Sequence, residues 1–324
     1  MALRIVTLLP SATEIVCALG ARNEIVGISH ECDYPENINA LPALTSPKIN
    51  IKTSSGEIDK NVRAAAQPTL AIYNLDSAKL QSLAPDVIIT QDLCDVCAVS
   101  YDEVCAAAKT IAGKDVKIVS LHPERFDDIF SDIQKVGAAI GRTAEAEQFI
   151  KESRARIATV KDRAARTSNR PAILTIEWLD PVMIGGTWMP EMVEICSATA
   201  LITKPGEKAP TVDIKKLETL DPECVIIKPC GFDVERTLQE LPLLQKNLPW
   251  FDWDAIMQAR VYVCDGNAYF NRPGPRIVDS LEILAACIHP KQFRDFRQKY
   301  AKSVVEIQMD LTVKRWDDEY IGIE

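Results

Sequence analysis

Short apolar runs that alternate with segments of helical spacing constrain the fold of this chain more than any other feature. The apolar runs have the length of buried strands and occupy residues 4–9, 25–28, 87–90 and 116–121. Between them, residues 75–83 and 101–112 carry apolar side chains at the spacing of a helix. Strands that alternate with helices in this way are typical of a parallel sheet covered by helices. The sequence therefore predicts an α/β protein with mainly parallel sheets.

The same alternation occurs a second time along the chain. It restarts at residues 172–178, after Arg170-Pro171. The segment at residues 217–226 also parallels the segment at residues 80–89, with an offset of 137 residues (217 against 80). In each copy a helix ends at a proline and an apolar strand follows. Such a repeat predicts two lobes of similar construction, one in each half of the chain.

A long helix is predicted between the two halves. No proline occurs between Pro123 and Pro171, and isoleucines recur there at helical spacing, as at Ile129 and Ile133. A helix of this length would link two lobes rather than belong to either of them. We therefore predict two Rossmann-like three-layer lobes bridged by one long α-helix. The predicted parts are an N-terminal α/β lobe at residues 1–124, the bridging helix at 125–165, a C-terminal α/β lobe at 166–303 and a tail of little structure at 304–324.

Composition excludes several classes of protein. The 324 residues are 47% hydrophobic and 26% charged, with a net charge of −9, the profile of a globular protein that has no general affinity for nucleic acid. No apolar run approaches the roughly 18 residues of a spanning helix, so membrane insertion is not expected. The first residues lack the charged and apolar regions of a secretion signal, and ten cysteines suit a reducing compartment. The expected location is therefore the cytoplasm.

Residues capable of metal or ligand chemistry gather in loops that follow predicted strands. His30 and Cys32 come after the strand at residues 25–28, and Cys94 and Cys97 come after the strand at residues 87–90. Open α/β sheets bind ligands at the carboxyl ends of their strands. Imidazole and thiolate together suit Zn²⁺, an iron–sulfur cluster or axial ligation of a corrinoid cobalt. The alternative is that these are free thiols, packed as small apolar residues beside a hydrogen-bonded histidine.

Aromatic residues are also concentrated in the predicted loops. A large, flat ligand would bury its faces against such rings, although some of them could be ordinary packing residues. Asp33 could accept hydrogen bonds from ligand amides or organise its own turn, and Arg272 could bind the ligand or serve the structure. Ser11 is expected to cap the helix after the first strand. The candidate ligand-binding residues are Ser11, Asp33, Tyr34, Tyr73, Trp178, Trp188, Tyr269, Phe270 and Arg272.

Several of these segments together resemble a known family. Residues 4–15 and 27–35, the loop at 185–189 with the helix after it, and the loop at 269–276 resemble the cobalamin-binding branch of the helical-backbone (class III) periplasmic binding proteins. The resemblance covers residues 4–290. It implies two three-layer α/β lobes bridged by one long helix, with a corrinoid or a ferric chelate held between the lobes.

Two departures from that family bear on function. Members that feed a membrane importer carry a secretion signal, and they present a surface glutamate on each lobe to the transporter. The positions that correspond to those glutamates hold Ala78 and Lys215 in this chain. Neither side chain can make an acidic contact. The departures predict an intracellular binding protein that has left transport, so that docking to a transporter is not expected.

Three functions follow from these observations. The first is a non-enzymatic intracellular protein that binds a corrinoid such as cobalamin in the cleft between the lobes. The second is a metal or iron–sulfur protein that holds Zn or Fe through His30, Cys32, Cys94 and Cys97. The third is an enzyme that acts on a corrinoid or another tetrapyrrole with thiols as nucleophiles or reductants. Catalysis is the least favoured, because the sequence contains no GxSxG elbow, P-loop or HExxH motif.

Overall fold

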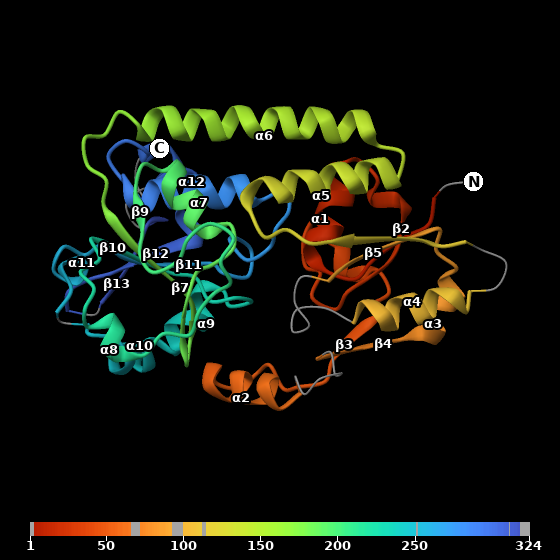
Figure 1. Ribbon diagram of the computed structural model, residues 1–324, viewed down its shortest axis with the longest axis horizontal. Coiled ribbons are helices and arrows are strands. Elements are labelled where there is room, and N and C mark those ends of the chain that lie inside the picture. Colours follow the sequence, from red (N-terminus) through yellow and green to blue (C-terminus); the bar gives the residue numbers. More distant parts are fainter. Residues whose placement is uncertain are drawn as a thin grey trace. The chain divides into compact units, whose positions relative to one another are not determined.

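A computed structural model of the chain is shown in Figure 1. The structure describes residues 3–65, 72–92, 100–111, 115–250, 252–310 and 312–317. The chain forms two compact units, each of which is described separately below. The first unit comprises residues 1–123, 127–152 and 273–275, and the second comprises residues 124–126, 153–272 and 276–324. Both units combine helices with a sheet that contains parallel strands, which confirms the predicted α/β class.

The first unit is built on a four-stranded sheet in the order β2-β1-β5-β6, with every pair of neighbours parallel. Its strands are β1 (Ile5–Thr7), β2 (Ile25–Ile28), β5 (Val87–Gln91) and β6 (Lys117–Leu121). The strands read as near-continuous apolar runs because helices cover both faces. Figure 1 shows α1 and α5 on one face and α3 and α4 on the other. The helices of this unit include α1 (Pro10–Ala18), α2 (Ser55–Ala65), α3 (Ser77–Leu83), α4 (Tyr101–Lys109) and α5 (Phe126–Ala139).

Smaller elements complete the first unit. Two short strands, β3 (Thr45–Pro47) and β4 (Tyr73–Leu75), form an antiparallel pair. Single 3-10 turns lie at Arg22–Glu24 and Ile38–Ala40. The residues that pack α3 and α4 onto the sheet form one buried cluster, in which Val6 and Ile88 of the strands meet Leu80 and Val104 of the helices. This cluster packs α3 and α4 against the strands β1 and β5.

The second unit contains a seven-stranded sheet in the order β13-β12-β11-β10-β7-β8, with β9 beside β7. The strands β7, β10 and β11 form its parallel centre. Helices α7 and α12 cover one face, and α8, α9 and α10 cover the other (Figure 1). The strands are β7 (Ala172–Leu179), β8 (Val182–Ile184), β9 (Thr199–Ala200), β10 (Cys224–Ile227), β11 (Val261–Cys264), β12 (Val304–Ile307) and β13 (Val313–Arg315). The helices are α7 (Met189–Ile195), α8 (Ile214–Leu217), α9 (Val234–Gln239), α10 (Leu241–Asn247), α11 (Asp254–Met257), α12 (Ile277–Ile288) and α13 (Arg294–Lys299), with a 3-10 turn at Ala301–Ser303.

The C-terminal segment corrects the prediction of a tail with little structure. Its residues form β12 and β13, which extend the second sheet by two antiparallel strands. All four residues of β12 are buried, and the Trp316 ring meets the Tyr262 ring edge-on at 5.9 Å. The segment is ordered because it covers the outer side of β11, which would otherwise expose an apolar strand to water.

The predicted single helix over residues 125–165 is also corrected, because this stretch forms two helices, α5 and α6 (Thr143–Ala164). Gly141 ends the first helix with a left-handed φ of +70°, and the N–H of Arg142 donates to the carbonyl of Gly137 at 2.7 Å. This is the hydrogen bond of a Schellman motif. A Cβ on Gly137 would lie 2.6 Å from the Cβ of Ala146, so the glycine lets α5 and α6 approach closely. Helix α6 contributes its residues up to 152 to the first unit and the others to the second.

The repeat noticed in the sequence is present in the structure. Asp76 caps α3 by accepting a hydrogen bond from the backbone N–H three residues later, and Asp213 caps α8 in the same way. Leu80 and Leu217 are the buried residues of these two helices. The strands β5 and β10 then begin at matching positions. The two units therefore share a helix–strand building block at a constant offset.

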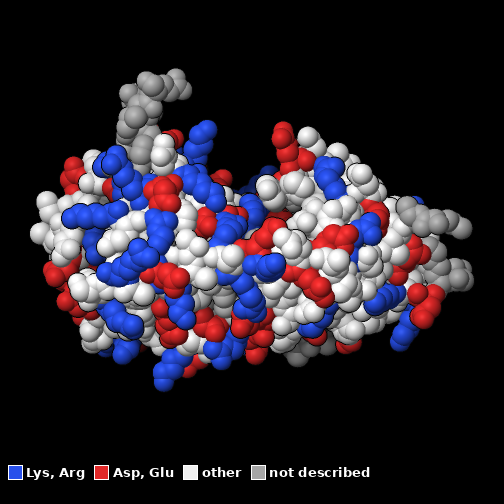
Figure 2. Space-filling model, turned by 90° about the horizontal axis from the view of Figure 1, so that it is seen from above, with Lys and Arg blue, Asp and Glu red and all other residues white. Residues whose placement is uncertain are grey.

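The lengths of the helices and the surface charge bear on membrane and nucleic-acid binding. Within the described residues, no helix is both long enough and apolar enough to cross a bilayer. Figure 2 shows acidic and basic side chains interspersed over the face that it presents. Mixed charge of this kind differs from the clustered basic surface that is typical of nucleic-acid binding.

Candidate functional site

The first candidate group lies at the carboxyl edge of the first sheet and centres on His30. The Nδ1 atom of His30 lies 2.7 Å from the hydroxyl of Thr45, and the ring meets the Tyr73 ring edge-on at 4.9 Å. Its Nε2 atom is buried and has no hydrogen-bond partner. Burial lowers the pKa of His30 below its ordinary value of 6.5, so the imidazole is neutral at pH 7. A neutral imidazole with one uncommitted nitrogen can bond a metal centre or a ligand donor.

Tyr73 supports this histidine from the strand β4. Its ring is 7% exposed, and its hydroxyl donates a hydrogen bond of 2.6 Å to Oε1 of Glu31. The hydroxyl is thus directed at a neighbouring carboxylate, while the ring forms one wall beside His30. The structure therefore brings together two of the residues that the sequence singled out, His30 and Tyr73.

Cys32 contacts the hydroxyl of Thr13, which was not among the predicted site residues. Its thiol is buried, and Sγ lies 3.0 Å from the hydroxyl of Thr13, which in turn lies 2.6 Å from the hydroxyl of Thr7. Cys94 and Cys97 lie outside the residues that the structure describes. Among the described residues, no three His, Cys, Asp or Glu side chains are grouped so that they could hold a metal ion. The four-ligand metal site stays a prediction.

The other predicted residues of the first unit are divided between core and surface. Ser11 does not cap α1, because that helix begins at Pro10 with Leu9 as its N-cap and no side-chain capping bond. Its side chain is buried beside Gly274, where a Cβ would lie 3.4 Å from the Cβ of Ser11, and its hydroxyl has no hydrogen-bond partner. Asp33 is exposed, and Tyr34 is 47% exposed.

The sequence did not single out a second histidine at the same edge as a site residue. His122 directly follows β6, and its Nδ1 lies 2.7 Å from Oδ1 of Asp92, which directly follows β5. Both side chains are about half exposed. The signal was present, since each residue comes immediately after one of two neighbouring parallel strands. The sequence analysis passed over it because a histidine directly before a proline and a helix is more often a structural residue than a ligand.

In the second unit, two predicted ligand contacts are interior residues. Trp188 is 6% exposed, and its indole N–H donates a hydrogen bond of 2.8 Å to the carbonyl of Phe270. Phe270 is fully buried, with a left-handed φ of +65°, and its N–H donates to the hydroxyl of Ser280 at 2.8 Å. These contacts fix the loop after β11 to α7 and α12. In the structure, both aromatic residues hold the loop in place.

Trp178 and Tyr269 are partly exposed, whereas Arg272 is buried. The Trp178 ring is partly exposed and packs on Phe232 at 5.3 Å, and its indole N–H donates to a carbonyl two residues later. Arg272 is 8% exposed and donates to the side-chain oxygen of Asn267 at 2.8 Å, an anchor within its own loop. Tyr269 is partly exposed and forms part of a pocket.

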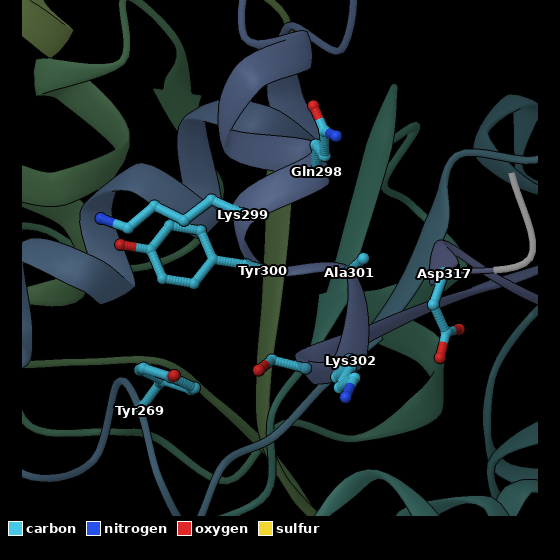
Figure 3. Close-up of a pocket in the computed structure, with 8 residues that line it drawn as sticks. Tyr269, Gln298, Lys299, Tyr300, Ala301, Lys302 and Asp317 are labelled. Carbon is cyan, nitrogen blue, oxygen red and sulfur yellow. The ribbon is translucent and has the colours of Figure 1, made fainter. Parts of the chain in front are cut away.

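This pocket lies where β11 ends and β12 begins, and it has a volume of about 400 Å³. Figure 3 shows the rings of Tyr269 and Tyr300 on one side of it and Asp317 on the other. The two rings meet edge-on at 6.1 Å. Burial raises the pKa of Tyr269 above its ordinary value of 10.0, so its phenol keeps its proton at neutral pH. The pocket is lined by Tyr269, Gln298, Lys299, Tyr300, Ala301, Lys302, Ser303 and Asp317.

A buried ion pair at the same edge of the second sheet was also missed. Lys228 directly follows β10 and is fully buried, and its Nζ lies 2.7 Å from Oε2 of Glu177 and 2.9 Å from Oδ1 of Asn271. Asn271 also donates from its amide to the carbonyls of Lys228 and Gly266. The available signal was a lysine placed immediately after an apolar strand. Lysine is almost never fully buried unless it is paired.

Comparisons with known proteins agree with this architecture. A family described as "Periplasmic binding protein" matches residues 5–268. An uncharacterized ABC transporter substrate-binding lipoprotein, YvrC, from Bacillus subtilis (strain 168) is 20% identical over 298 residues, which cover 90% of this chain and 82% of that protein. A vitamin B12-binding protein from Yersinia pseudotuberculosis serotype O:3 (strain YPIII) is 22% identical over 258 residues, covering 77% of this chain and 80% of that protein.

A solved structure shows the same fold. The periplasmic heme-binding protein RhuT from Roseiflexus sp. RS-1, in its apo form, superposes with a TM-score of 0.68 at 20% sequence identity, and the match covers 90% of this chain and all of the other. At this level of sequence identity the likeness establishes the fold alone.

Proposed function

Because the chain belongs to the periplasmic binding protein family, as a substrate-binding protein of the ABC transporter type, we propose that it binds a metal-centred macrocycle of the corrinoid class. The observation that carries this proposal is the neutral imidazole of His30, whose buried Nε2 has no partner at the carboxyl edge of the first sheet. Ligands of open α/β sheets bind at that edge. An imidazole nitrogen is a suitable axial ligand for cobalt or iron.

Two further features support a corrinoid. The vitamin B12-binding relative aligns over most of both chains. Within the second unit, the rings of Trp178 and Tyr269 are partly exposed, and exposed aromatic rings are suited to covering the apolar face of a flat macrocycle. Haem is the second candidate, because it also offers an axial metal position to His30 and because a heme-binding protein shares the fold.

Titration with hydroxocobalamin, followed by visible absorbance, tests the proposal. We expect a saturable spectral change at one ligand per chain with a dissociation constant at or below the micromolar range. In His30→Ala we expect the spectral change to be lost while equilibrium dialysis still detects bound ligand. The absence of binding at tens of micromolar protein would refute a corrinoid ligand, and haemin in a parallel titration tests the second candidate.

We also propose that the protein works inside the cell without acidic contacts to a transporter. Ala78 and Lys215 stand exposed near the starts of α3 and α8, the matching helices of the two units. These are the positions at which the resemblance to the family leads one to expect glutamates. Fractionation of cells that produce the native chain tests the location, and recovery outside the cytoplasm would contradict it.

A further inference from the structure

The feature that leads beyond the proposed function is the buried lysine at the carboxyl edge of the second sheet. Its ammonium group is fully enclosed and bonded to Glu177 and Asn271. Replacing a buried ion pair by apolar residues of similar volume is often neutral or stabilising. The pair is therefore weak evidence for a stabilising role, and its geometry leads us to examine how it orients Glu177.

The backbone at Glu177 supports this role. Strand β7 pairs with β8 through Ile176 and Ile184, and then through Trp178 and Met183, so the register shifts by one residue. Glu177 is the extra residue of this β-bulge. Bulges re-aim a side chain and are frequent beside binding and catalytic sites. Here the bulge occurs near the carboxyl end of a central parallel strand, where a ligand is expected.

The two carboxylate oxygens of Glu177 differ in their hydrogen bonding. Oε2 accepts the hydrogen bond from Lys228 at 2.7 Å, whereas Oε1 has no hydrogen bond or ion pair with any described residue. The side chain is 26% exposed. A carboxylate accepts hydrogen bonds and donates none, so Oε1 suits a ligand N–H and repels a ligand carboxylate.

From these contacts we propose that Glu177 is a specificity-determining ligand contact and that Lys228 is its positioning residue. The inference rests on the proposed function and names which macrocycle the site takes. A corrin carries carboxamide side chains, which donate hydrogen bonds from their N–H groups. Haem carries propionates, which only accept hydrogen bonds and bear negative charge. Glu177 therefore favours an amide-bearing corrinoid over haem.

The test compares the affinities of hydroxocobalamin and haemin, measured by absorbance titration, in the full-length protein and its variants. Glu177→Gln removes the negative charge and adds a donor with little change in shape. We expect it to weaken hydroxocobalamin binding and strengthen haemin binding, so that the ratio of the two affinities falls by about tenfold or more. Glu194→Gln, on the exposed side of α7, is the matched control and should leave the ratio unchanged.

Lys228→Met tests the positioning role. The methionine fills a similar volume and leaves Glu177 without its partner, so we expect a loss of selectivity in the same direction. The double variant should lose little more than either single variant, because both act through one contact. Far-UV circular dichroism identifies any variant that fails to fold, in which case Glu177→Gln alone decides the question.

The outcomes separate this inference from the proposed function. If the unmodified protein binds hydroxocobalamin and Glu177→Gln leaves the selectivity ratio within twofold of the control, the role of Glu177 is refuted and corrinoid binding stands. If the unmodified protein binds no corrinoid, the proposed function itself fails. A drop in the ratio in Glu177→Gln and Lys228→Met, with none in Glu194→Gln, supports the inference.

Discussion

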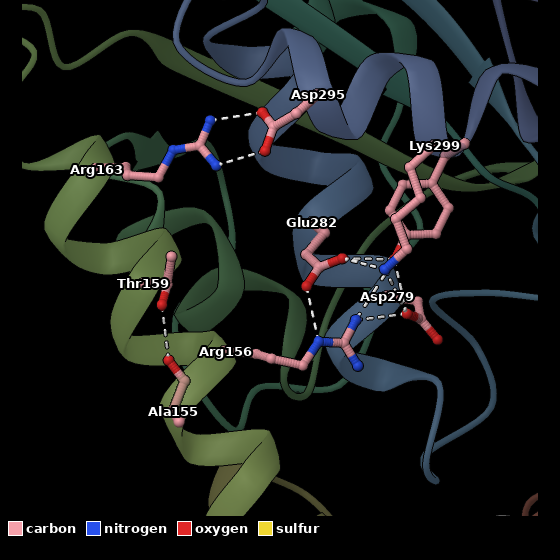
Figure 4. A network of polar contacts seen from close by, with 9 residues as sticks. Ala155, Arg156, Thr159, Arg163, Asp279, Glu282, Asp295 and Lys299 are labelled. Atoms are coloured by element: carbon pink, nitrogen blue, oxygen red, sulfur yellow. Dashed lines mark hydrogen bonds and ion pairs between the residues drawn. The ribbon is translucent and has the colours of Figure 1, made fainter.

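The C-terminal half of α6 is held within the second unit by a network of charged groups that a single substitution can test. Arg156 donates from Nη2 to Asp279 at 2.6 Å and from Nε to Glu282 at 2.8 Å (Figure 4). Lys299 and the hydroxyl of Tyr300 also bond to Glu282, at 2.9 Å and 2.6 Å. Arg156→Met removes the guanidinium but keeps an apolar stem that can pack against the same surface.

The expected loss of stability follows from the exposure of the partners. Glu282 is 4% exposed and Asp279 is 23% exposed, whereas Arg156 is 39% exposed and is partly screened by water. Two charge-assisted hydrogen bonds would contribute about 3–6 kcal/mol if fully buried. Screening of the arginine reduces this figure, and Glu282 keeps two other partners. We therefore expect Arg156→Met to lower the free energy of unfolding of the second unit by about 2 kcal/mol.

The distribution of tryptophan makes the assay specific for this unit. All five tryptophans of the chain lie in the second unit, at Trp178, Trp188, Trp250, Trp253 and Trp316. Urea unfolding followed by tryptophan fluorescence should show a midpoint lowered by about 1 M. Lys161→Met, at an exposed position of the same helix, is the control and should shift the midpoint little. Equal midpoints for Arg156→Met and Lys161→Met would refute the stabilising role of the network.

Three further predictions concern the second unit. Burial alone would raise the pKa of Glu282, but hydrogen bonds from Arg156, Tyr300 and Lys299 outweigh it and lower the pKa below the ordinary 4.5. The stability that this carboxylate contributes is fully present above pH 4.5, the pKa of the unfolded state, and it is lost as the pH falls through the lowered pKa of the folded state. The difference between the unmodified protein and Arg156→Met in urea should therefore shrink on acidification below pH 4.5, and a constant difference would contradict this. Trp188→Phe leaves the carbonyl of Phe270 without its 2.8 Å hydrogen bond and should cost about 1–3 kcal/mol in thermal or urea unfolding, whereas an unchanged midpoint would show that the bond contributes nothing. In Gly266→Ala the new Cβ would lie 2.1 Å from a backbone carbonyl oxygen, so we expect a loss of about 3 kcal/mol in the same assay, and stability equal to that of the unmodified protein would rule out the clash.

The fold class could be predicted because its signals are local. Strand β5, for example, consists of five buried residues in an apolar run, and the helix before it carries its own capping aspartate, Asp76. The break between α5 and α6 is also encoded locally, by Gly141 and its left-handed backbone. It was missed because the isoleucine spacing continues across it, so that the apolar pattern outweighed the glycine. Periodicity reports which side chains are buried, and it does not report whether the backbone remains one helix.

The candidate groups of the site could be located in part. His30 was singled out as a candidate because it follows a recognisable strand. The interior positions of Trp188 and Phe270 could not be predicted, because aromatic residues of loops and of the core look alike in sequence. Their burial depends on a hydrogen bond between residues 82 positions apart in the chain. The tail was misjudged for a similar reason, since β12 is stabilised by pairing with β11, whose sequence lies about 40 residues earlier.

Lys228 shows what kind of residue sequence analysis overlooks. A lysine beside an apolar strand is ordinarily interpreted as the first solvated residue after the strand. Here its ammonium group is enclosed, because a bulge places Glu177 beside it and the side chain of Asn271 closes the loop over it. None of the three residues is unusual by itself, and the pair becomes significant only when the strands are assembled into a sheet. A buried charge that costs energy to desolvate and directs a partly exposed carboxylate to the carboxyl edge is better explained by recognition than by stability. The selectivity of Glu177→Gln between an amide-bearing and a carboxylate-bearing macrocycle is therefore the measurement that relates this assembly to function.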